Sequence, residues 1–60
     1  MIKGYLGVDV GSVSTNLVVI DDQNQLLVEQ YLRTNGKPIE TVQQGLYAIG
    51  QELPADVQIA

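Results

Sequence analysis

One acidic residue interrupts an otherwise apolar segment of the chain, directly before a turn of small residues. Asp9 lies between Val8 and Val10, and a Gly-Ser-Val-Ser turn occupies residues 11–14. A carboxylate buried among aliphatic side chains costs free energy unless a partner offsets that cost, and no Lys or Arg occurs in the ten residues after Asp9. A Mg²⁺ ion, reached directly or through water, is a partner that would explain a carboxylate at this position.

The turn that follows has the composition of a phosphate-binding loop. Gly11 permits a sharp hairpin and leaves backbone N–H groups uncovered, and consecutive N–H groups in a tight turn form a concave anion site. One short element would then hold both a phosphate and a Mg²⁺ ion at Asp9. The candidate binding residues, which include three small hydroxyl donors, are Asp9, Gly11, Ser12, Val13, Ser14 and Thr15.

This motif differs from the two commonest nucleotide loops. The chain contains neither G-x-x-x-x-G-K-[ST] nor G-x-G-x-x-G, and the residues after the turn favour a strand rather than a helix. On spacing alone, an Asp that merely caps a Gly/Ser turn explains the segment equally well. The succession of apolar strand, Asp, Gly/Ser turn and β-branched strand favours the binding site.

The composition excludes several kinds of chemistry for these residues. The chain has 60 residues with 3 Lys+Arg, 7 Asp+Glu, a net charge of −4, and no Cys or His. It therefore lacks the groups of a disulfide framework, a zinc site, a thiol nucleophile or an imidazole base. Its acidic balance argues against nucleic-acid binding, which depends on Lys and Arg at the phosphates. We expect a cytoplasmic protein without a membrane span, because no apolar run approaches about 18 residues.

The other charged residues are interpreted as solvated. Adjacent carboxylates at Asp21 and Asp22 indicate a turn rather than a metal site. Arg33 and Lys37 flank the end of a predicted strand and could meet a nucleotide, but a solvated position is the simpler interpretation.

Hydrophobic patterning predicts four strands and one helix. Residues 4–10 alternate as a strand, residues 15–20 are rich in β-branched types, and residues 26–33 form a third strand. Pro38 suits the first position of a helix, and Val57 opens a fourth strand.

The same patterning predicts which faces are buried. Apolar residues on both faces of 15–20 predict a central strand covered on both sides. The apolar face of the third strand is expected to be Leu26, Val28 and Leu32. The helix is expected to pack on the sheet through one apolar stripe, formed by Ile39, Val42, Leu46, Ile49 and Leu53.

The order β-β-β-α-β predicts an α/β fold that opens like a ribonuclease-H-like domain. Short connections make the first three strands an antiparallel meander, and a helix crossover brings the fourth strand parallel to the first. The last residues have the pattern of an opening strand. Residues 1–60 are therefore interpreted as the N-terminal part of a ribonuclease-H-like ATPase domain whose remainder lies beyond them.

The segment from Gly7 to Thr15 resembles the first phosphate-binding motif of the superfamily of actin, sugar kinases and heat-shock chaperone ATPases. Together with the segments 31–34 (Tyr-Leu-Arg-Thr) and 36–39 (Gly-Lys-Pro-Ile), it is most similar to the N-terminus of the activators of 2-hydroxyacyl-CoA dehydratases, the benzoyl-CoA-reductase-type ATPases. The resemblance covers nearly the whole chain. It implies two ribonuclease-H-like domains that close over Mg-ATP, with Asp9 positioning Mg²⁺ through water and the hairpin 11–14 cradling the β- and γ-phosphates.

The resemblance to the activators implies further properties of a parent protein. Such activators are homodimers that hold one 4Fe–4S cluster between subunits and use ATP hydrolysis to drive an electron onto a partner acyl-CoA dehydratase. The cluster ligands and the catalytic base would lie outside these residues, so the 60 residues alone are expected to be inactive. Thr15 matches a position that usually carries a small hydroxyl residue, whereas Asn16 departs from the Lys of many activators, which puts a phosphate contact there in doubt.

Other function classes remain open at this point. They are a sugar-kinase-like phosphotransferase, a ribonuclease-H-like nuclease or resolvase whose first-strand Asp ligates a catalytic Mg²⁺, and a non-catalytic actin-like protein that binds nucleotide. The low content of Lys and Arg counts against the nuclease.

Overall fold

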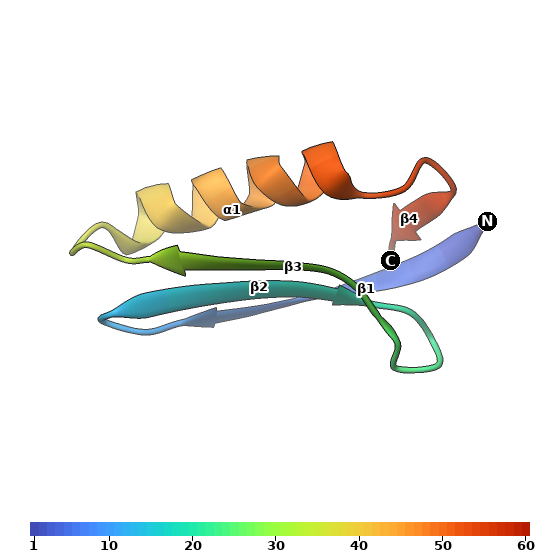
Figure 1. Cartoon of the computed structure of the whole chain (residues 1–60), viewed down its shortest axis with the longest axis horizontal. Coiled ribbons are helices and arrows are strands. Elements are labelled where there is room, and N and C mark those ends of the chain that lie inside the picture. Colours follow the sequence, from blue (N-terminus) through green and yellow to red (C-terminus); the bar gives the residue numbers. More distant parts are fainter.

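The chain forms a four-stranded mixed sheet with a single helix lying along one face (Figure 1). The computed structural model describes residues 1–60. The strands are β1 (Ile2–Val10), β2 (Ser14–Ile20), β3 (Leu26–Arg33) and β4 (Val57–Ile59), and the helix α1 spans Pro38–Glu52. Every predicted element is present, which confirms the α/β class and the β-β-β-α-β order. The helix α1 is too short and too polar to span a lipid bilayer.

The strands are arranged in the order β3-β2-β1-β4. The pairs β1–β2 and β2–β3 are antiparallel, and β4 pairs in parallel with β1. The predicted antiparallel meander, and the helix connection to a fourth strand parallel to the first, are therefore confirmed. Figure 1 shows that the β1–β2 turn and the loop before α1 lie at the same end of the sheet.

The core lies between α1 and one face of β2 and β3. Leu17 and Val19 of β2 are fully buried, and they cluster with Val28 of β3 and Ile49 of α1. The other face of β2 is only half-buried along its whole length. The expectation that both faces of this strand are covered is thus wrong for these residues, because the only helix lies on one side of the sheet.

The helix packs through two small residues, Thr41 and Gly45, and through only part of the predicted apolar stripe, Ile49 and Leu53. Its buried residues are Thr41, Gly45 and Ile49, whereas Ile39 and Leu46 are 74% and 42% exposed. Gly45 lets the helix backbone lie against β2, because a Cβ at this position would overlap a core leucine. This close approach turns part of the predicted stripe toward β1, where no element covers it.

A β-bulge changes which residues of β3 face the core. The register between β2 and β3 shifts between Val19, which pairs with Val28, and Ile20, which pairs with Leu26. The extra residue, Leu27, packs against the core, while Leu26 is 57% exposed. The predicted placing of Leu26 on the apolar face is therefore wrong, because a bulge inserts one residue into the alternation.

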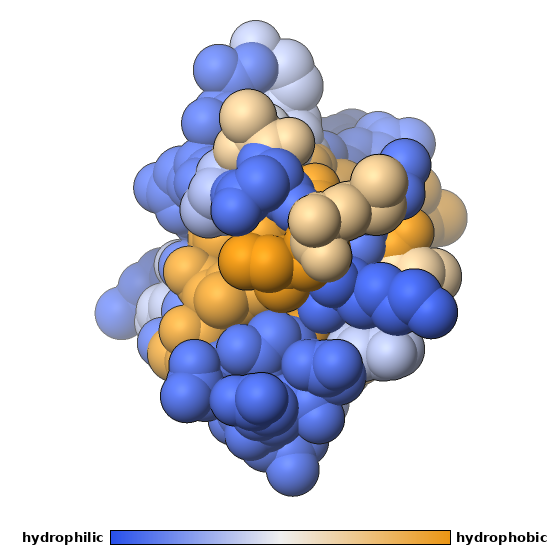
Figure 2. Space-filling model, turned by 90° about the vertical axis from the view of Figure 1, so that its right-hand side faces the viewer, coloured by the Kyte–Doolittle hydropathy of each residue, from blue (hydrophilic) through white to orange (hydrophobic).

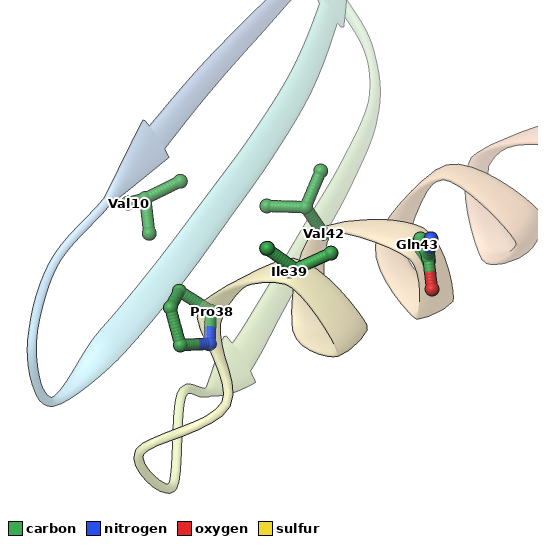
Figure 3. Close-up of a pocket in the computed structure, with 5 residues that line it drawn as sticks. All are labelled: Val10, Pro38, Ile39, Val42 and Gln43. Carbon is green, nitrogen blue, oxygen red and sulfur yellow. The ribbon is translucent and has the colours of Figure 1, made fainter.

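The helix leaves apolar side chains of β1 exposed. Leu6, Val8 and Val10 lie on the sheet face that carries α1, yet each is at least 36% exposed. Val10, Ile39 and Val42 line a groove of about 300 Å³ between β1 and the start of α1. Figure 3 shows Val10 facing Ile39 and Val42 across this groove. Seen from the end of the molecule, hydrophobic side chains form a band across its middle, between hydrophilic surfaces (Figure 2). The side chains of Leu6, Val8 and Val10 therefore lie open beside the helix along β1.

Candidate functional site

The predicted site residues lie at the end of the sheet where β1 turns into β2. Asp9 is the penultimate residue of β1, and its Cα partner across the hairpin is Asn16. Its neighbours Val8 and Val10 are on the α1 side, so the Asp9 side chain is on the opposite face of the sheet. No element covers that face, and Asp9 is exposed. The expectation of a buried carboxylate is therefore wrong, and the Asp9 carboxylate is instead open to water and to a hydrated cation.

The turn after Asp9 presents free backbone amides. The Gly11 N–H donates to the Ser14 carbonyl oxygen at 2.8 Å and closes the turn. The amides of Ser12 and Val13 donate no hydrogen bond within the chain, and both residues are exposed. Two consecutive free N–H groups in a tight turn are the element from which backbone anion sites are built.

Gly11 is favoured in this turn by the lack of space for a side chain rather than by an unusual backbone angle. A Cβ at Gly11 would lie 3.0 Å from the Ser14 carbonyl oxygen, which is closer than nearly all real Cβ contacts. The residues with positive φ are elsewhere, at Asn24, Asn35 and Gly36. The absence of a side chain therefore lets the two strands close tightly beneath the free amides.

Thr15 is separated from the other candidate residues. Its side chain is fully buried on the α1 face, and its hydroxyl lies 2.8 Å from the hydroxyl of Thr34. The structure thus brings Asp9 and residues 11–14 together on the surface and turns Thr15 inward. The assignment of Thr15 to the phosphate site stays a prediction, but its hydroxyl already has a protein partner.

Thr34, which follows β3, is the residue that holds this turn, and the sequence interpretation missed it. Its hydroxyl donates to the Gly11 carbonyl oxygen at 2.8 Å, and its N–H donates to the Val13 carbonyl oxygen at 2.9 Å. The Thr41 hydroxyl in turn lies 3.1 Å from the Thr34 carbonyl oxygen. The only sequence signal was a threonine at a strand end, which is too common to identify a partner far along the chain.

Basic residues lie closer to the turn than the sequence interpretation suggested. Arg33 is the Cα partner of Ser14 across β2 and β3, and it is exposed. Arg33 and Lys37 also line a polar hollow of about 220 Å³ beside the first turn of α1, together with Glu40. Both cations are solvated as expected, but the strand register brings Arg33 to the end of the sheet that carries the free amides.

The acidic residues are not gathered into a cluster. Nowhere in the chain do three or more His, Cys, Asp or Glu side chains come together to hold a metal ion. A divalent cation at Asp9 would therefore take most of its ligands from water and from a bound phosphate, as Mg²⁺ usually does in nucleotide sites. Asp21 has a different role, because one of its carboxylate oxygens accepts the N–H groups of Gln23 and Gln25 and so forms the β2–β3 turn.

Comparison of the chain with protein-family models, with curated proteins and with solved structures finds no match.

Proposed function

We propose that residues 1–60 carry the phosphate-binding half of a Mg-ATP site, in an ATPase of the actin, sugar-kinase and heat-shock chaperone superfamily. The main support is the pair of partnerless amides at Ser12 and Val13, in an exposed turn that directly follows the strand of Asp9. Such a site catalyses in-line attack on the γ-phosphate, with Mg²⁺ and backbone N–H groups stabilising the developing charge.

Each part of the turn has a distinct role in this proposal. The N–H groups of Ser12 and Val13 donate to phosphate oxygens, and the Ser12 hydroxyl adds a third donor. The exposed Asp9 carboxylate positions Mg²⁺ through water. Arg33 adds a positive charge beside Ser14, its Cα partner, at the edge of the same surface. The residues present therefore fit a nucleotide phosphate with its magnesium ion.

The proposed family of the parent protein rests on the resemblance of this sequence to the activators of 2-hydroxyacyl-CoA dehydratases. In that family the parent is a cytoplasmic homodimer that couples ATP hydrolysis to electron transfer onto the dehydratase. A 4Fe–4S cluster would need ligands from elsewhere in the parent, since these residues include no Cys. The exposed apolar residues Leu6, Val8 and Val10 support the view that further residues of the same domain cover this side of the sheet.

An NMR titration of the isotope-labelled chain with Mg-ATP tests the site directly. We expect chemical-shift changes at the amides of residues 9–16, with a dissociation constant in the millimolar range because half of the site is absent. Mg-AMP lacks the β- and γ-phosphates and serves as the control, with little change expected at the turn. Equal responses to the two nucleotides would contradict the phosphate assignment. A micromolar constant for Mg-ATP would instead contradict the view that half of the site lies outside these residues.

A further inference from the structure

We propose that Thr34 is the positioning residue of the phosphate turn, and that its hydroxyl aims the Ser12 amide outward at the ligand. The ligand part of this inference rests on the proposed function. The positioning itself rests on contacts that Thr34 makes with the turn from a loop 23 residues further along the chain.

Thr34 holds the turn at two points. Its hydroxyl donates to the Gly11 carbonyl oxygen at 2.8 Å, and its N–H donates to the Val13 carbonyl oxygen at 2.9 Å. These two carbonyl groups belong to the residues on either side of Ser12. The segment that presents the free amides is therefore fixed from the interior at both of its ends.

The geometry of the peptide bond between Gly11 and Ser12 determines where the Ser12 N–H points. The Gly11 carbonyl and the Ser12 N–H belong to the same peptide unit, which is trans because the chain has no cis peptide bonds. In a trans peptide the C=O and the N–H point in opposite directions. Because Thr34 binds the Gly11 oxygen from the buried side, the Ser12 N–H points toward solvent. A carbonyl that accepts a hydrogen bond also makes the N–H of its own peptide a stronger donor.

The number of hydroxyl hydrogens available shows which neighbours donate hydrogen bonds to Thr34. A threonine hydroxyl has one hydrogen, and that of Thr34 goes to the Gly11 oxygen. In the 2.8 Å contact between Thr15 and Thr34 the donor must therefore be Thr15. The Thr41 hydroxyl lies 3.1 Å from the Thr34 carbonyl oxygen and 2.7 Å from the Lys37 carbonyl oxygen. Contacts from β2 and from α1 thus both hold Thr34 in place, and this fixes the position from which its hydroxyl binds the turn.

Three variants of the chain separate this role from general stability. Thr34→Val removes the hydroxyl at constant shape, Thr34→Ser keeps the hydroxyl, and Val57→Ala removes buried apolar volume at the opposite end of β1 from the turn. In Thr34→Val we expect the protection factor of the Gly11 amide against hydrogen exchange to fall about tenfold, measured relative to that of the core amide of Leu17. We also expect the dissociation constant for Mg-ATP to rise about three- to tenfold. Both quantities should stay near the wild-type values in Thr34→Ser and in Val57→Ala.

The outcomes distinguish the two proposals. Equal Gly11 protection in Thr34→Val and Thr34→Ser would overturn the positioning role, whatever the chain binds. No response of the wild-type chain to Mg-ATP would overturn the proposed function and the ligand part of this inference, while the protection data still decide whether Thr34 fixes the turn. If Thr34→Val does not fold, the wild-type spectrum decides the role. The bond to Gly11 predicts a slowly exchanging Thr34 hydroxyl proton with a nuclear Overhauser contact to Gly11, and its absence would overturn the inference.

Discussion

We expect Asp9→Asn to lower the proposed Mg-dependent ATP turnover by at least about tenfold in a protein that contains residues 1–60 together with the rest of the proposed site. The substitution keeps the size and shape of the side chain and removes the negative charge that would hold hydrated Mg²⁺ beside the turn amides. Because Asp9 is exposed and lies on a sheet face that no element covers, the loss of its charge should leave the fold intact. Steady-state turnover at saturating Mg²⁺ and ATP measures the effect.

Asp22→Asn is the matched control for this experiment. Asp22 is also an exposed carboxylate in a turn, but it lies at the opposite end of β2 from the amides of residues 12 and 13. The control variant carries the same change in charge and should retain wild-type turnover. If Asp9→Asn also retains it, Asp9 does not position the metal ion, and the proposed role of this residue is wrong.

The elements and their order could be predicted because each has a local signal in the sequence. Pro38 at the start of α1 is one example, since a proline lacks an N–H and suits the first turn of a helix. The run of β-branched residues in β2 is another. Once three strands and a helix crossover were recognised, the parallel pairing of β4 with β1 followed from the general rules of chain connection.

The details of burial could not be predicted because they depend on contacts between distant residues. The alternation in β3 gives no sign of the bulge that exposes Leu26, since that bulge arises from pairing with β2. The position of the helix over the sheet is likewise set by Gly45, whose weak helix propensity would make it appear unfavourable from sequence alone.

In the candidate site, too, the residues adjacent in sequence could be predicted and the contacts between distant residues could not. Asp9 and the turn after it were identified from residue types that are adjacent in sequence, and the structure places them together at the surface. The inward direction of Thr15 and the hold of Thr34 on the turn both depend on the β2–β3 register and on the loop that follows β3. A site built on one hairpin is thus visible in the sequence, whereas the residues that orient it from another segment are not.

Gly45→Ala and Gly50→Ala make the same change in the same helix and should shift stability in opposite directions. A Cβ at Gly45 would overlap the side chain of Leu17 and lie 3.0 Å from its Cδ2, whereas a Cβ at Gly50 would meet nothing within 4 Å. Leu17 is fully buried in the core and has little room to move, so overpacking should cost close to the upper end of the usual range of about 1–3 kcal/mol. The gain in helix propensity, about 1 kcal/mol, offsets only part of that cost at Gly45 but acts alone at Gly50.

Urea unfolding of the two variants and the wild-type chain measures this difference as a shift of the midpoint. We expect the midpoint to fall in Gly45→Ala and to rise in Gly50→Ala. A midpoint at or above the wild-type value in Gly45→Ala would contradict the close contact between the helix and β2. That contact fixes how the helix lies on the sheet, and with it the position of Thr41, whose hydroxyl binds the carbonyl oxygen of Thr34 beside the turn of residues 11–14. The stability of Gly45→Ala therefore also tests the packing on which the candidate site depends.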